Sequence, residues 1–280
     1  MPITTWADWM DGQNSGERRP FMWQHGNNNP FSSWILRWPT YFTGPLGVPS
    51  NPSTAIAPDN TSTLAVVPSP SAADQWLAAC EIGIGNANRR IAGGMVLCDV
   101  LSVQGGLSGT VASPTAQTTN LPTAALTRYT DGDGVMMGLV IYGAVGGTAT
   151  TATVSYTDDV NGAGRTSADI VFGGSSANAA GQVLVLIPQA GDRNPVSVES
   201  VTLANTTGTA GNFGVVLFKP IAFLNEIGGT NSQREPYKNF IEGASSVSPE
   251  TTGCLVPFFF GTGGSTGVCM VGGHVTYIQG

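Results

Sequence analysis

The chain has 280 residues, 41% of them hydrophobic, which is enough apolar material for one large or two small folded domains and too much for a disordered chain. Glycine (38 residues) and proline (18) are abundant whereas charged residues make up only 10%, a composition that argues against surface helices and favours many short strands joined by turns. A net charge of −7 with only two lysines excludes the basic face that nucleic-acid binding needs, and no apolar run predicts a membrane span or a secretion signal.

Positions 1–60 are predicted to form an extended N-terminal arm. Five of the six tryptophans lie between positions 6 and 38, among Asn, Gly, Ser, Pro and Arg, and a proline-dense run follows that blocks helix and ladder pairing. Three interpretations stay open: a cap on the chain's own sandwich, a stacking site for carbohydrate, and an arm that docks on other subunits. Because Trp and Arg are favoured at buried contact patches, we favour docking. The predicted partner-binding residues are Trp6, Trp9, Arg18, Arg19, Phe21, Trp23, Trp34, Arg37 and Trp38.

Positions 61–225 carry the strand signals and are predicted to form the folded domain. The runs 133–145, 181–190 and 213–224 are almost continuously apolar, as expected of strands covered on both faces. The segment 71–80 has a weak helix-capping pattern and could instead lead directly into a strand.

The sequence predicts one hairpin clearly in the middle of this domain. Ala152, Val154 and Tyr156 alternate with Thr and Ser, which is the two-residue period of a half-buried antiparallel strand. The Asn-Gly and Gly residues of 158–164 predict a turn, and 165–172 is predicted to be the returning strand.

A β-bulge is predicted further along the chain. Val198 and Val201 are out of phase with each other on a regular strand, and one extra residue near Glu199 and Ser200 would restore their common face. Eight to ten strands at regular spacing, with no amphipathic helices between them, predict an all-β chain built as an antiparallel β-sandwich of jelly-roll type.

Positions 226–280 are predicted to be a C-terminal linker and β tail, with a polar stretch followed by two apolar runs that form a terminal hairpin. Four cysteines lack the close spacing of a zinc site, and we expect reduced, buried thiols. A disulfide between Cys254 and Cys269 across the hairpin is the alternative.

The candidate chemical motifs are weak. Asp131 and Asp133 begin like a calcium loop, but the residues that follow are apolar, so a turn is favoured. Asp158 and Asp159 are adjacent and would point to opposite faces of a strand, which does not suit an acid–base pair. Neither histidine has a recognisable nucleophile motif beside it. We therefore expect no enzymatic activity, no cofactor and no bound metal.

Three stretches resemble a family of virion structural proteins of tailed bacteriophages and prophages. They are "RRIAGGMVLCDVLSVQGGLSGT", "LPTAALTRYTDGDGVMMGLVIYGAVGGTATTATVSYTDDVNGAGRTSADI" and "VESVTLANTTGTAGNFGVVLFKPIAFL". The resemblance covers about positions 89–225 and consists of strands and turns without a catalytic signature. It implies a component of the virion.

From this resemblance we expect a structural, non-enzymatic virion protein that assembles in the bacterial host cytoplasm. A capsid decoration or cement protein is favoured, docked through its terminal arms on other virion proteins, the major capsid protein first among them, and forming a homo-oligomer. The alternatives are a neck, tail or baseplate component, and a glycan-binding receptor module. No nucleic-acid or membrane partner is expected.

Overall fold

The computed structural model describes residue 7 and residues 16–25, 36–37, 53–62, 64–71, 75–86, 92–122, 125–175, 179–226, 237–239, 249–262 and 269–279. The elements of this part of the chain are β-strands, and every paired strand is antiparallel to its neighbour. The prediction of an all-β antiparallel sandwich is therefore confirmed. Within the described ranges, no helix has the length and apolarity that crossing a membrane would require.

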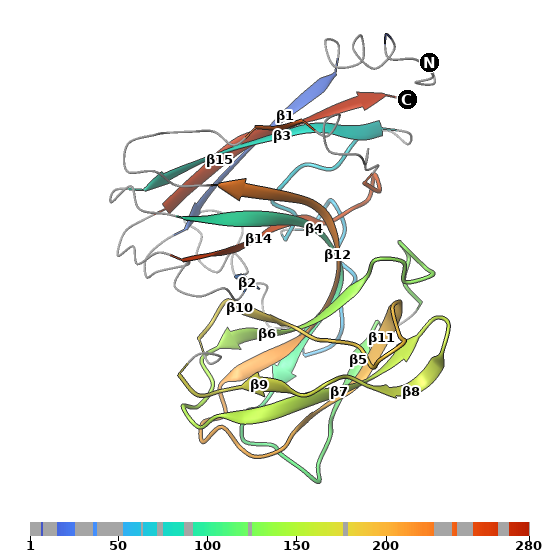
Figure 1. The fold of residues 1–280 in the computed structure, drawn as a ribbon, viewed down its shortest axis with the longest axis vertical. Coiled ribbons are helices and arrows are strands. Elements are labelled where there is room, and N and C mark those ends of the chain that lie inside the picture. The colour runs from blue at the N-terminus through green and yellow to red at the C-terminus, as the bar shows by residue number, and fades with distance from the viewer. Residues whose placement is uncertain are drawn as a thin grey trace.

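The strands form three hydrogen-bonded groups (Figure 1). One is a four-stranded sheet in the order β1 (Glu17–His25), β15 (Cys269–Gln279), β3 (Gln75–Asn86) and β13 (Tyr237–Asn239). A closed barrel joins β10 (Gln182–Val185), β2 (Leu36–Arg37), β14 (Leu255–Thr262), β4 (Ala92–Leu107), β12 (Asn212–Glu226) and β6 (Met136–Gly143). The third is a five-stranded sheet of β5 (Gln117–Leu121), β11 (Pro195–Leu203), β7 (Thr150–Asp158), β8 (Gly162–Thr166) and β9 (Ile170–Phe172).

The two longest strands, β4 and β12, connect the parts of the molecule. They curve from beside the five-stranded sheet to beside the four-stranded sheet (Figure 1), and three register shifts along their pairing accommodate the curvature. Successive side chains of β12 point to opposite faces, so Leu217 packs in the core shared with the five-stranded sheet whereas Phe218 packs in the core inside the barrel. The strands are thus covered on both faces, which explains their continuous apolar runs.

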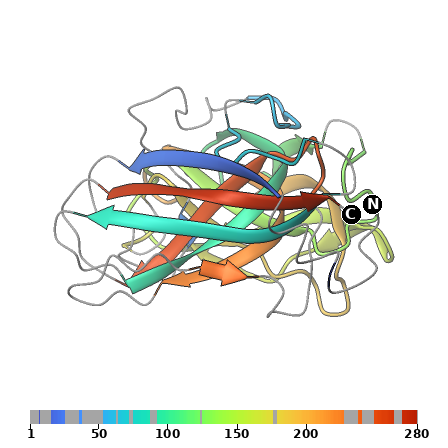
Figure 2. The same ribbon diagram turned by 90° about the horizontal axis from the view of Figure 1, so that it is seen from above.

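The four-stranded sheet brings together segments from the two ends of the sequence. Seen from above, β1, β15 and β3 lie side by side (Figure 2), and β15 pairs with β1 on one side and β3 on the other. Val275, Tyr277 and Ile278 of β15 are buried, as is Leu77 of β3. Strands from positions 1–60 and 226–280 are therefore integrated with those of 61–225.

Several sequence expectations can be compared with the strands directly. β7 alternates buried and half-buried residues over its whole length, as predicted. The predicted bulge is confirmed, because the pairing of β11 with both of its neighbours shifts register between Val198 and Ser200.

The structure also decides the alternatives at the two ends of the domain. Segment 75–80 is strand, not helix. The two C-terminal strands form but pair with different sheets, so they are not a hairpin with each other. Cys254 has a free, buried thiol.

Candidate docking face and polar networks

The outer face of the five-stranded sheet is an array of hydroxyl side chains. Because Ala152, Val154 and Tyr156 face the core, the intervening residues of β7 must face outward, and all of them are Thr or Ser. The cross-strand register continues the pattern in rows. These rows are Thr118–Ser200–Ser155–Thr166 across four strands, Thr202–Thr153, and Ser197–Thr157. The result is a regular, almost uncharged surface at the end of the molecule opposite the four-stranded sheet (Figure 1).

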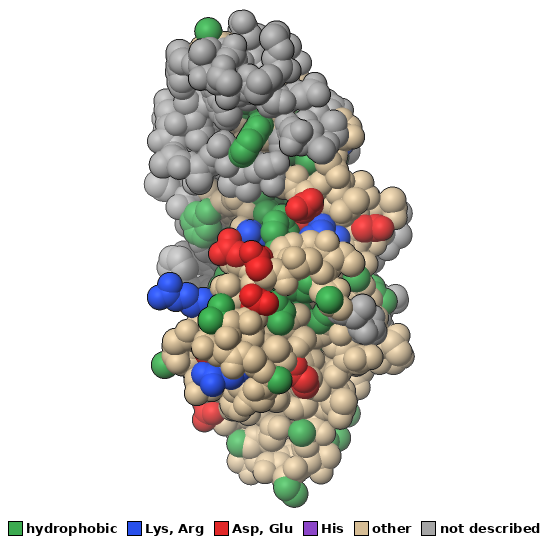
Figure 3. Space-filling view, turned by 90° about the vertical axis from the view of Figure 1, so that its right-hand side faces the viewer, with side chains coloured by type: hydrophobic (Ala, Val, Ile, Leu, Met, Phe, Trp, Pro, Cys, Tyr) green, Lys and Arg blue, Asp and Glu red, His purple; other side chains and the backbone are tan. Residues whose placement is uncertain are grey.

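The surrounding surface is also poor in charge. In Figure 3, the end of the molecule that holds the five-stranded sheet shows mostly uncharged polar side chains and backbone, with a few charged and hydrophobic side chains among them. Hydroxyl groups both donate and accept hydrogen bonds, so such a face meets another protein surface with little desolvation cost.

Glu199 of β11 adds a carboxylate to this face. As the extra residue of the β11 bulge it has no register partner, and its Oε1 accepts hydrogen bonds from Thr157 Oγ1 (2.7 Å) and Ser197 Oγ (2.6 Å). The bulge therefore directs its carboxylate along the sheet, where two hydroxyl groups of the neighbouring row hold it.

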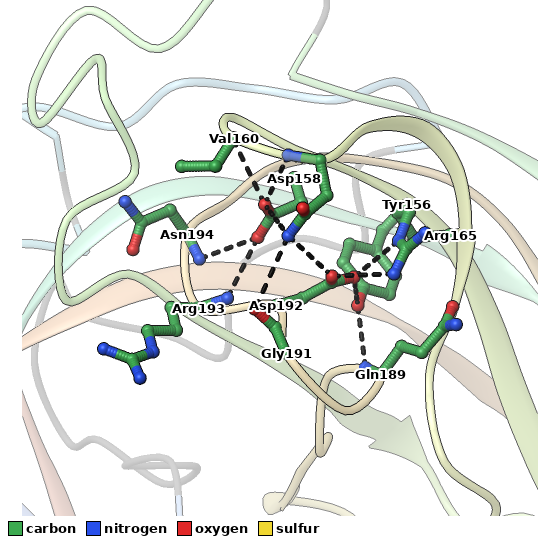
Figure 4. A network of polar contacts seen from close by, with 10 residues as sticks. Tyr156, Asp158, Val160, Arg165, Gln189, Gly191, Asp192, Arg193 and Asn194 are labelled. Atoms are coloured by element: carbon green, nitrogen blue, oxygen red, sulfur yellow. Dashed lines mark hydrogen bonds and ion pairs between the residues drawn. The ribbon is translucent and has the colours of Figure 1, made fainter.

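A dense polar network closes one edge of the same sheet (Figure 4). The carboxylate of Asp192 accepts two hydrogen bonds from Arg165 (Nε to Oδ2, 2.8 Å; Nη2 to Oδ1, 2.9 Å), one from Tyr156 Oη (2.5 Å) and one from Asn161 Nδ2 (2.9 Å). The Arg165 guanidinium, more than any other group, holds the pKa of Asp192 below its ordinary value. Burial and the nearby Asp192 raise the pKa of Tyr156 to about 12, so its hydroxyl stays protonated and donates.

Asp158 forms the other half of this network. Its Oδ2 accepts hydrogen bonds from the backbone N–H groups of Arg193 (3.0 Å) and Asn194 (2.9 Å), and its Oδ1 accepts from the N–H groups of Val160 and Asn161. Although burial raises the pKa of Asp158, these backbone donors outweigh it and lower the pKa overall. The two carboxylates tie the turn after β7 to the loop before β11, which is a structural role.

A second ion pair is buried beside β4, between Asp99 of that strand and Arg128 of the loop before β6. Arg128, 6% exposed, donates to both oxygens of Asp99, and also to the carbonyl groups of Pro58 and Val100. Asp99 additionally accepts from the N–H group of Cys254 at 2.9 Å. This cluster links β4, the start of β14 and the loop that contains Arg128.

Three glycines, Gly109, Gly146 and Gly173, surround Thr207 and bring four loops together, namely their own three and the loop of Thr207. Thr207 is fully buried, and its Oγ1 accepts a hydrogen bond from the N–H group of Gly146 (3.0 Å) and donates to a backbone carbonyl, with Thr209 at 2.9 Å and Gly109 at 3.2 Å as the acceptors in reach. A Cβ atom at Gly146 would lie 1.7 Å from the carbonyl oxygen of Thr207, so the loops approach too closely for any side chain there. "GTAGNFG", which contributes to the resemblance, includes part of this cluster.

The predicted partner-binding residues fall into two groups. Arg18, Arg19, Phe21 and Trp23 lie on β1, and Arg37 lies on β2. The Arg19 side chain donates to the carbonyl oxygen of Ser69 and lies 6.0 Å from the centre of the Tyr277 ring. Trp6, Trp9, Trp34 and Trp38 lie outside the described residues.

Sequence reasoning missed both the hydroxyl face and the Asp192 network. The hydroxyl face could have been predicted from β7, because Thr and Ser alternate with apolar residues there and the outward-facing residues are as regularly spaced as the inward-facing ones. The Asp192 network leaves no local pattern in the sequence, because Asp192 is 27 residues from Arg165 and 36 from Tyr156.

The candidate calcium loop is a turn, in which Asp131 Oδ1 accepts a hydrogen bond from the N–H group of Asp133. The described residues contain no group of three side chains suited to hold a metal.

No protein-family model and no curated protein sequence matches the chain. Among solved structures, the chain matches the crystal structure of the infectious bursal disease virus VP2 subviral particle. The match covers 94% of this chain and 81% of that chain, at 10% sequence identity and a TM-score of 0.20. At this level of similarity, nothing about the function of this chain is inferred from it.

Proposed function

We propose that this protein is a non-enzymatic structural component of a tailed-phage virion. The hydroxyl face of the five-stranded sheet is the observation that carries the proposal, because it is a regular, solvent-accessible surface without the converging charges or nucleophiles that chemistry requires. The Asp158 and Asp192 carboxylates, by contrast, are engaged by structural donors. The motifs behind the phage-protein resemblance supply Arg128, Tyr156 and Arg165, which hold the scaffold together.

Within the virion we favour a capsid decoration or cement role. A protein that binds only the assembled shell stabilises it by mass action, and a neutral face adapts to a large partner surface at low desolvation cost. In this role the predicted arm residues, including Trp6, Trp9 and Trp38, contact neighbouring subunits, and the major capsid protein is the principal partner.

A binding experiment with purified particles tests this role. We expect the wild-type protein to co-sediment with empty capsids and not with isolated tails. Ser155→Lys places a charge in the middle of the hydroxyl face and should weaken capsid binding by about tenfold or more, because the ammonium group would be buried unpaired.

Val160→Lys is the matched control, because Val160 is 76% exposed in the turn after β7 and lies off the hydroxyl face. It should bind like the wild type. Binding to tails alone would replace the decoration role by a neck, tail or baseplate role. Binding to neither, together with glycan binding that Trp23→Ala abolishes, would overturn the structural role.

A further inference from the structure

The N-terminal strand β1 is attached to the fold as an edge strand. It lies at the end of the four-stranded sheet with β15 as its hydrogen-bonded neighbour. The pairing runs from Glu17↔Tyr277 to His25↔Cys269, nine residue pairs without a register shift. Pro20 within it is exposed and suits an edge position, because proline cannot donate to a second ladder.

The connection that follows β1 is long enough to reach another molecule. β1 ends at His25, and β2 begins at Leu36 in a different sheet, the barrel. Ten residues, "GNNNPFSSWI", separate the two strands. Fully extended, ten residues span at most about 33–36 Å, which is comparable to the diameter of a small domain.

The edge of β15 can pair with β1 of its own chain or with β1 of a second copy. The acceptor consists of backbone groups of β15, together with the Ser69 carbonyl and the Tyr277 ring that receive Arg19. A β1 strand donated by a second copy would make identical contacts. The choice between the two therefore depends on effective concentration and on linker reach, and close packing of subunits favours exchange.

We propose that β1 of one copy pairs with β15 of a neighbouring copy, so that subunits are joined by exchange of their N-terminal strands. This inference rests on the proposed role as a packed virion component. It gives the predicted partner residues of β1, Arg19, Phe21 and Trp23 among them, a defined binding surface on the second copy.

The chain offers a one-residue reporter for this exchange. His25 is the register partner of the native Cys269, and directly opposed Cα atoms on antiparallel strands lie within the range that a disulfide spans. His25→Cys should therefore form a disulfide with Cys269 under mild oxidation. Gln24→Cys is the matched control, because the register partner of position 24 is Met270 and not Cys269, so it should not crosslink. Cys80, Cys98 and Cys254 are buried and do not compete.

Two co-expressed full-length chains then separate exchange from self-pairing. The donor carries His25→Cys and Cys269→Ser with an affinity tag, and the acceptor is the wild type. A disulfide between position 25 and Cys269 can form in this mixture only across two molecules. With equal expression of the two chains, exchange pairs a donor strand with an acceptor copy about half of the time. We therefore expect about half of the donor chains, in the purified protein and in assembled particles, to run at twice the monomer mass on a non-reducing gel and to return to the monomer position after reduction.

Each other outcome is decisive. If the His25→Cys single variant forms only an intramolecular disulfide and the mixture gives no donor–acceptor dimer, strand exchange is excluded. If the single variant forms no disulfide at all, the β1–β15 register itself is wrong and the proposal fails. Either result leaves the virion role standing as long as the wild type still co-sediments with capsids, so the two failures are distinguishable.

Discussion

Arg128 and Asp99 form a two-point ion pair in the interior of the protein, with Nε to Oδ2 at 3.0 Å and Nη2 to Oδ1 at 2.9 Å. Arg128 also donates to two backbone carbonyl groups, and Asp99 accepts from the N–H group of Cys254. Removing one partner of a buried ion pair destabilises the fold much more than replacing both partners by uncharged residues, because the remaining charge stays buried without a counter-ion. This asymmetry makes the pair a sensitive point of the fold.

Arg128→Met should lower the free energy of unfolding by about 3–5 kcal/mol, because it leaves the Asp99 carboxylate buried without its counter-ion. Adding Asp99→Asn should recover part of this loss, since the charge is removed and an oxygen remains for the Cys254 N–H group. Urea unfolding at neutral pH measures both. Arg193→Met, at an exposed position, is the control and should change stability by less than about 0.5 kcal/mol. Equal stability of Arg128→Met and Arg193→Met would refute the argument.

The Asp192 network should make the protein sensitive to acid. The pKa of Asp192 is lowered in the folded state, chiefly by Arg165. In the unfolded state the pKa of this aspartate is the ordinary value of about 3.9. The unfolded state therefore binds the proton more readily, so the network stabilises the fold above about pH 4 and this contribution is lost as the pH falls further.

Asp192→Asn removes the titrating group and tests this directly. Unfolding curves at pH 7 should show the variant to be less stable than the wild type, and the difference should shrink as the pH is lowered below about 4. A difference that stays constant from neutral to acidic pH would mean that the charge of Asp192 does not contribute.

The sequence predicted those parts of the fold that depend on local periodicity. The alternation on β7 and the phase break between Val198 and Val201 are both properties of a few neighbouring residues, and both are confirmed. The barrel was beyond such reasoning, because it closes where β2, only two residues long, pairs with β10 and β14. A two-residue strand has no periodicity to detect.

The same contrast applies to the candidate site. The TDDVNGAG turn was predicted from its glycines, yet the role of Asp158 depends on backbone donors 35 and 36 residues away. The C-terminal runs were predicted to be strands, but their partners were not, since β14 and β15 select sheets whose other strands come from distant segments. Pairing between segments far apart in sequence is decided by the whole chain.

The glycine cluster predicts a steep contrast between two adjacent positions. Gly146→Ala would place a methyl group 1.7 Å from the Thr207 carbonyl oxygen, so the four loops would have to separate. The loss of stability should be about 3 kcal/mol or more. Gly147→Ala has no atom within 4 Å of its new methyl group and should change stability by less than about 0.5 kcal/mol. Thermal unfolding of the two variants side by side checks the prediction, and similar melting temperatures would contradict it.

Deleting the bulge residue should be tolerated better than deleting its neighbour on the same strand. Val198 and Ser200 pair with the consecutive residues Tyr156 and Ser155, so removal of Glu199 keeps these pairs with β7 in register and leaves Val201 and Leu203 facing the core. The cost is the loss of two hydroxyl hydrogen bonds, about 1–2 kcal/mol. Deletion of Thr202 instead moves the buried Leu203 to the outer face and should cost at least about 2–5 kcal/mol. Urea unfolding of both deletions measures the difference, and a protein that loses its fold without Glu199 but keeps it without Thr202 would show that the bulge, not the alternation, sets the register of β11.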